Sequence, residues 1–179
     1  MSFSDTELKN IEALKAQAGH ARDNFIKLLL NVDLSHNGKL IEILKENIIV
    51  AGGYFPSLIH KEPINDIDIF IPSDLNIILS KAGYIRFEQI LASLESERKI
   101  KLKSSNVIAY QNPSLEKVIN IVGTPYQIIF SKMIKREEVI AHFDFKHCTI
   151  SFQNQNLYLT ESAYRAAKDK ILIPHNSEK

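Results

Sequence analysis

The chain has few of several residue types, and each shortage narrows the possible classes of protein. Its 179 residues include a single cysteine, Cys148, so no internal disulfide can form and a reducing compartment suits it. No apolar run approaches the roughly 18 residues of a membrane-spanning helix, and residues 1–5 lack the pattern of a secretion signal. We therefore expect a cytoplasmic protein without membrane contact.

An excess of charge of one sign is also missing. The 22 lysines and arginines nearly balance 21 aspartates and glutamates, which leaves a net charge of +1. Any nucleic-acid partner would therefore need a local basic patch. Lysines alternate over residues 99–103, but lysine at a sheet edge also discourages pairing with other chains, so we interpret this run as an edge strand or solvated loop.

Two adjacent glycines end the first apolar run that resembles a strand. Residues 48–51 are apolar and are followed by Gly52 and Gly53. Glycine lets the backbone turn tightly and approach a ligand closely. A helix over residues 54–60 would begin directly after this turn, and its unpaired amides would face an anion such as a phosphate.

Two carboxylates follow on a second apolar run. Because strand residues alternate between faces, Asp66 and Asp68 should share one face while Ile67, Ile69 and Ile71 occupy the other. Two close carboxylates repel each other unless a cation lies between them. Since Mg²⁺ usually binds through one or two carboxylates plus substrate phosphates, the pattern predicts a site for Mg²⁺ or Mn²⁺ with a triphosphate.

With these two motifs the sequence resembles the nucleotidyltransferase superfamily, whose DNA polymerase β-like fold includes poly(A) polymerases and CCA-adding enzymes. The resemblance is close over residues 46–72 and elsewhere follows the order of elements. It implies that Asp66 and Asp68 are catalytic metal ligands and that Gly52 and Gly53 contact the nucleotide phosphates. It also implies transfer of a nucleotidyl group from a nucleoside triphosphate to RNA, a protein or a small molecule.

Many members of the superfamily carry a third carboxylate on a later strand. Residues 126–130 look like this strand but offer Gln127, and an amide cannot replace an anionic ligand without weakening the site. Asp144, within residues 142–148, has the expected apolar flanks, and this segment resembles one in uncharacterised phage members of the superfamily. Asp144 is therefore a catalytic candidate that would bind metal or deprotonate the acceptor. The alternative is that it caps a turn before the next strand.

His147 and Cys148 stand side by side but do not form a metal pair in this interpretation. On a strand over residues 147–152 they would face opposite sides of the sheet, and no further cysteine completes a zinc site. Cys148 is expected to be a small buried apolar residue. His147 is expected to pack, with contact to the nucleotide as the alternative.

The order of elements predicts an α+β fold with a mixed, mainly antiparallel nucleotidyltransferase-type sheet and helices packed on it. A long amphipathic helix and a second helix form an N-terminal helical addition, residues 1–45, ahead of a nucleotidyltransferase-like domain, residues 46–179, in one compact unit. Further helices are expected over residues 75–81, 86–98, 136–142 and 161–170, and strands over residues 107–110, 117–122, 126–130, 147–152 and 157–159.

A second function remains open at this point. The small size and the amide at Gln127 also suit a non-catalytic relative, which would use the same fold as a nucleotide-binding or protein-interaction module. A protein of phage origin would act in the host cytoplasm in either case.

Overall fold

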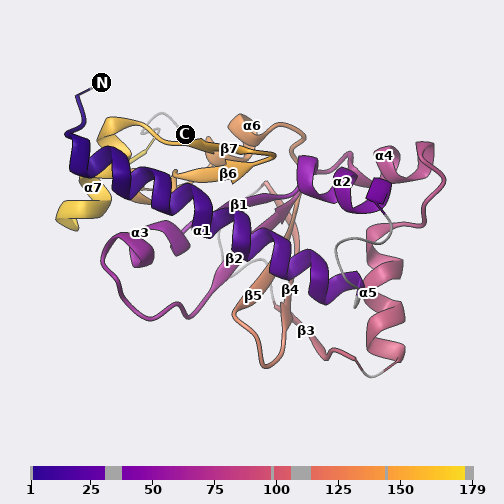
Figure 1. The fold of residues 1–179 in the computed structure, drawn as a ribbon. Helices are drawn as coiled ribbons and strands as arrows, with labels where there is room; N and C mark the ends of the chain where they lie inside the picture. The colour runs from indigo at the N-terminus through magenta and orange to yellow at the C-terminus, as the bar shows by residue number, and fades with distance from the viewer. Residues whose placement is uncertain (1, 31–37, 98, 106–113, 144, 176–179) are drawn as a thin grey trace.

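The computed structural model describes residues 2–30, 38–97, 99–105, 114–143 and 145–175. Its helices are α1 (Asp5–Leu30), α2 (Gly38–Asn47), α3 (Tyr54–Ile59), α4 (Leu75–Lys81), α5 (Phe87–Ser96), α6 (Arg136–Ile140) and α7 (Glu161–Asp169), with a 3-10 turn η2 (Lys146–Cys148). Its strands are β1 (Ile49–Ala51), β2 (Ile67–Ile71), β3 (Leu102–Ser105), β4 (Leu115–Ile121), β5 (Tyr126–Ser131), β6 (Ser151–Gln153) and β7 (Asn156–Tyr158). Figure 1 shows α1 crossing in front of the sheet, with α7 at one end and α5 at the other.

The strands form one mixed sheet in the order β3-β4-β5-β2-β1-β6-β7. Strands β2 and β5 are parallel, and the other neighbouring pairs are antiparallel. The predicted α+β fold with a mainly antiparallel sheet is therefore confirmed. The lysine-rich run leads into β3, which lies at the sheet edge, where lysine was expected.

The strand predicted over residues 147–152 begins later than expected. Residues 146–148 form η2, and strand β6 begins only at Ser151. The hydroxyl of Thr149 donates to the carbonyl of Lys146 at 2.7 Å, and such side-chain bonds to nearby backbone compete with a strand ladder. The helix expected to reach residue 98 ends as α5 at Ser96, and the strand predicted over residues 107–110 lies outside the described residues.

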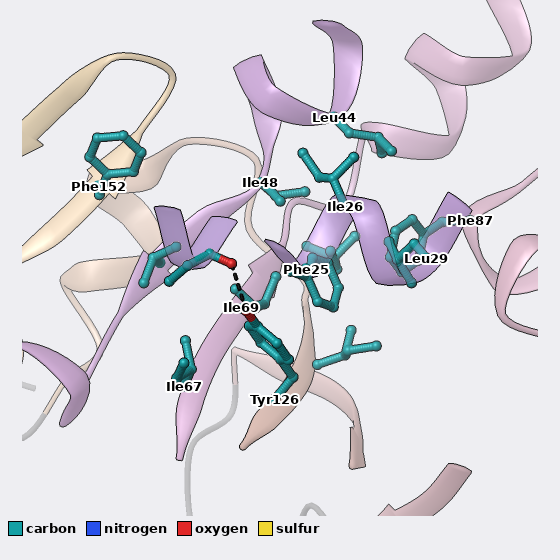
Figure 2. Close-up of a cluster of buried hydrophobic side chains, with 14 of the residues drawn as sticks. Phe25, Ile26, Leu29, Leu44, Ile48, Ile67, Ile69, Phe87, Tyr126 and Phe152 are labelled. Atoms are coloured by element: carbon teal, nitrogen blue, oxygen red, sulfur yellow. Dashed lines mark hydrogen bonds between the residues drawn. The ribbon is translucent and has the colours of Figure 1, made fainter. Parts of the chain in front are cut away.

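The main core lies between one face of the sheet and the helices α1, α2, α4 and α5, with buried side chains of α3 and α7 added to it; Figure 2 shows part of this cluster. Phe25 and Leu29 of α1 are fully buried beside Leu44 of α2, and the hydroxyl of Tyr126 donates to the carbonyl of Ala21 at 2.8 Å. The predicted N-terminal addition therefore supplies part of this core. Its status as a unit separate from residues 46–179 stays a prediction.

A smaller apolar cluster covers the opposite face of the sheet. Ile49, Phe70 and Ile129 pack there against Val139 of α6 and its neighbours. Phe70 and Ile129 of this cluster also line a pocket at the end of β1. The candidate site lies on this face.

A cluster of charged side chains joins α1 to α7. The Glu7 carboxylate at the start of α1 accepts hydrogen bonds from Arg165 and Lys168 of α7, the latter at 3.2 Å. The Ser4 hydroxyl caps the same turn by accepting from the Glu7 amide at 3.1 Å. The hydrogen bond from Arg165, followed by that from the Ser4 amide, lowers the pKa of Glu7 to about 2.

We expect Glu7→Gln to lower thermal stability at neutral pH and to change its pH dependence. The lowered pKa of Glu7 means that its stabilising effect is present above about pH 4.5, the ordinary value, and is lost as the pH falls toward 2. Melting curves of the two proteins should therefore converge in this acidic range. Glu12→Gln, on the exposed side of α1, is the control, and parallel pH profiles for wild type and Glu7→Gln would contradict the prediction.

Candidate functional site

The end of β1 is shaped by two glycines with different surroundings. Gly52 has a φ of +84°, where side chains other than hydrogen are strained, and a Cβ there would lie 2.7 Å from Oδ2 of Asp68. Gly53 begins α3 with a φ of −65°, and a Cβ there would meet nothing within 4 Å. Gly52 thus permits a close approach of the carboxylate to the backbone, whereas Gly53 faces open space.

Asp68 lies on β2, between β1 and β5. Its backbone pairs with Ala51 on one side and with Gln127 on the other. Ile67 and Ile69 point into the main core, so Asp68 faces the opposite side, as the strand alternation predicts. The sequence predicted Asp66 on the same strand. In the structure it precedes the first residue of β2 and is exposed, so this part of the prediction is wrong.

The carboxylate of Asp68 is poorly compensated within the protein. Its Oδ1 atom is buried and has no hydrogen-bond partner among the residues that the structure describes. Burial, and secondly the negative charge of Asp66, raise the pKa of Asp68 to about 7. A bound cation would relieve both causes, and the pair of carboxylate oxygens fits Mg²⁺ or Mn²⁺. The described residues contain no group of three or more His, Cys, Asp or Glu side chains that could hold a metal.

Gly52, Gly53 and Asp68 lie together in a pocket of about 250 Å³, named here the Asp68 pocket. Its other lining residues are Phe70, Leu115, Gln127, Ile129, His142, Phe143, Phe145 and Cys148. This described lining contains no lysine or arginine. The motif predicted both glycines and both acids at one site, but Asp66 is not among the lining residues of this pocket. The aromatic wall was not expected.

Gln127 occupies the strand position beside Asp68 where a third carboxylate was sought. Its Nε2 donates to Oδ1 of Asn120 on β4 at 3.0 Å. The structure therefore brings an amide, and not a carboxylate, next to Asp68 at this point of β5. Asp144 lies outside the described residues, while its neighbours Phe143 and Phe145 both line the Asp68 pocket.

His147 and Cys148 differ from their expected placement. Both lie in η2, not on a strand, and Cys148 is half-buried and lines the Asp68 pocket, so its expected full burial is wrong. The imidazole of His147 stacks on the ring of Phe145 with centroids 5.8 Å apart, which agrees with a packing role. Burial lowers the pKa of His147.

Solved structures with a similar arrangement include a tRNA nucleotidyltransferase and CCA-adding enzymes, all at low identity. A tRNA nucleotidyltransferase with a primer tRNA and an incoming ATP analog is 11% identical, with 78% of this chain and 38% of that chain covered and a TM-score of 0.48. A CCA-adding enzyme of Bacillus stearothermophilus with CTP is 16% identical, with 79% and 33% covered and a TM-score of 0.46. This chain thus spans only 38% and 33% of their lengths, and such distant similarity carries no functional conclusion.

Sequence comparison gives a closer assignment. No curated protein matches the chain. Residues 21–170, which are more than half of the chain, match the family described as Gabija anti-defense 2 family protein, or Gad2. The chain therefore belongs to the Gabija anti-defense 2 family.

Proposed function

We propose that this protein is a metal-dependent nucleotidyltransferase that moves a nucleotidyl group from a nucleoside triphosphate to an acceptor. The observation that carries the proposal is the Asp68 carboxylate, which is buried at Oδ1 without a partner among the described residues, raised in pKa and held against Gly52. A protein gains nothing in stability from such a group. A ligand that supplies positive charge explains why the site is built this way.

The proposed roles follow from the positions of the residues. Asp66 and Asp68 would hold Mg²⁺ or Mn²⁺, which supplies charge neutralisation and orientation of the triphosphate when bound. Gly52 leaves room for the Asp68 carboxylate, and the backbone at Gly52 and Gly53 would contact the phosphates. The acceptor hydroxyl would attack the α-phosphorus in line with the departing pyrophosphate. Asp144 is proposed from the sequence as the group that deprotonates this hydroxyl or adds a metal ligand.

We further propose that the reaction serves the anti-defence role named in the family description, with RNA, a protein or a small molecule as acceptor. In the described part of the chain no helix is long and apolar enough to cross a membrane. An anti-defence protein must act where the defence acts. We therefore propose a phage protein that works in the cytoplasm of the infected host, with residues 46–179 carrying the reaction.

The second candidate function is a non-catalytic module on the same fold. The hydrogen-bonded pair of Gln127 and Asn120 favours it, because an uncharged amide stands beside Asp68 where a third acidic ligand would strengthen metal binding. In that case the protein would act by binding a nucleotide or a protein of the defence system. The two candidates differ in whether the Asp68 pocket binds metal and triphosphate together.

We expect a nucleoside triphosphate to raise the melting temperature only when Mg²⁺ or Mn²⁺ is also present. The described lining of the Asp68 pocket has no lysine or arginine, so a triphosphate would meet the Asp68 carboxylate without a cationic side chain of that lining to offset the repulsion. Ligand at 100 times its dissociation constant should stabilise the protein by about 2.7 kcal/mol. Thermal melts with each nucleotide, with metal and with EDTA, measure this.

Asp66→Asn is the variant that tests the metal dependence in this experiment. Its side chain is exposed, so the substitution should change the ligand-free melting temperature less than Asp68→Asn does, while it removes one of the two carboxylates proposed to hold the metal. Loss of the joint metal and triphosphate effect in this variant would support the proposal. A shift produced by nucleotide alone, or no shift with any nucleotide, would contradict it and favour the non-catalytic module.

A further inference from the structure

Phe145 is an aromatic side chain with an unusual position. Its side chain is 37% exposed, although it is large and apolar, and it lines the Asp68 pocket. Phe143, two residues earlier, lines the same pocket but packs on Phe70 with ring centroids 5.5 Å apart. Phe143 therefore belongs to the apolar cluster beneath the pocket, whereas Phe145 leaves much of its surface open.

Phe145 is held in place by contacts with neighbouring residues. It stacks on the imidazole of His147 with an interplanar angle of 25° and centroids 5.8 Å apart. Its backbone forms a β-bridge with Pro174, and the amide of Lys146 donates to the carbonyl of Ile173 at 2.8 Å. These contacts tie the segment that carries Phe145 to the C-terminal segment, so the ring is held in place before any ligand arrives.

The Asp68 pocket therefore has two chemically different parts. One part contains the Asp68 carboxylate and the glycine turn, which suit a metal and phosphates. The other is mainly aromatic and apolar and includes the partly exposed Phe145. A nucleoside triphosphate has the same division, with a charged end and a flat base that stacks on aromatic rings.

On this basis we propose that Phe145 is the platform on which the base of the incoming nucleoside triphosphate stacks, with His147 supporting the ring from the other side. The inference rests on the proposed nucleotide site and adds a contact for the base. Stacking uses the face of the base and not its hydrogen-bonding edge. The platform should therefore accept all four bases, which leaves base selection to other groups.

The absence of tryptophan from the chain permits a direct test with Phe145→Trp. This variant has one tryptophan, placed at the opening of the pocket, so its fluorescence reports on that position alone. We expect quenching on addition of ATP or CTP with Mg²⁺ and little change with inorganic tripolyphosphate and Mg²⁺, which has no base. Tyr158→Trp is the matched control, because Tyr158 is similarly exposed at 36% and lies outside the pocket beside Arg136.

Phe145→Ala supplies the affinity measurement. Its dissociation constants for ATP and CTP with Mg²⁺ should rise roughly 5- to 100-fold, the loss expected for one stacked base, while that for tripolyphosphate should stay the same. Calorimetric titration with the three ligands compares them directly. Equal weakening of all three, or unchanged nucleotide affinity, would overturn the platform.

The two proposals fail in different ways. If wild type binds neither nucleotides nor tripolyphosphate with metal, the proposed nucleotide site fails and the platform fails with it. If wild type binds both but Phe145→Trp shows no quenching and Phe145→Ala no selective loss, the nucleotide site stands and only the platform is wrong.

Discussion

Asp68→Asn is expected to abolish metal-dependent nucleotidyl transfer and, at the same time, to stabilise the metal-free protein at pH 8. Outer-shell partners of metal ligands typically contribute roughly 10- to 100-fold to activity, so loss of a direct ligand should cost more than that. Asparagine has nearly the same shape as aspartate and fits beside Gly52. The loss of activity should therefore come without damage to the fold.

The gain in stability follows from the raised pKa of Asp68. The pKa moves from an ordinary value of 3.8 to about 7, so the folded protein holds this proton more tightly than the unfolded chain. Wild-type stability therefore falls as the pH rises through this window, whereas the variant has no such proton to lose. A shift of about three pKa units corresponds to on the order of 4 kcal/mol, which should appear above pH 7 and vanish near pH 4.

Chemical denaturation in EDTA between pH 4 and pH 8 measures this difference. Asp66→Asn should show a smaller gain, because the charge of Asp66 is the lesser cause of the shift and burial is the greater. A variant Asp68→Asn that is less stable than wild type at pH 8 would show that the carboxylate stabilises the fold. The site would then be structural and not functional.

Gly52→Ala should disrupt both fold and activity. The φ of +84° costs a residue with a Cβ about 1–3 kcal/mol in strain, and the new carbon would also lie 2.7 Å from Oδ2 of Asp68. Either the turn or the carboxylate must move, so metal-dependent binding of a triphosphate should fall with stability. Denaturant unfolding and the thermal melts with nucleotide and Mg²⁺ measure the two effects separately.

The neighbouring glycine provides a control of the same chemistry. Gly53→Ala places its Cβ in open space at a φ of −65°, which alanine adopts without strain. Gly53 is the N-cap of α3, and replacing a preferred N-cap residue by alanine typically costs about 1 kcal/mol. The free energy of unfolding of this variant should therefore stay within about 1 kcal/mol of wild type. Equal losses at the two positions would show that the close contact with Asp68 has no special importance.

The part of the site near β1 and β2 could be predicted because it depends on local periodicity. Alternation along five strand residues places Asp68 opposite Ile67 and Ile69, and this side of the strand is confirmed. A glycine pair after a buried run predicts a turn in the same way, and the positive φ of Gly52 bears this out. Both features involve residues whose neighbours in sequence are also their neighbours in space.

The aromatic wall could not be predicted because tertiary contacts form it. Phe145 lies at the pocket since its backbone pairs with Pro174 and a 3-10 turn follows it, and neither contact has a periodic pattern in the sequence. The hydroxyl of Thr149 donates to the carbonyl of Lys146, and η2 lies here in place of the expected strand. Cys148 of η2 lines the pocket.

The most direct test of nucleotidyl transfer compares triphosphates labelled at the α- and the γ-phosphate. The protein is incubated with Mg²⁺, each labelled nucleotide and an extract of cells that carry the Gabija system, and the products are separated. We expect wild type to transfer the α-label to an acceptor and to release the γ-label as pyrophosphate, and Asp68→Asn to do neither. Retention of the γ-label on the acceptor, or equal α-labelling by wild type and Asp68→Asn, would contradict a nucleotidyl transfer centred on Asp68.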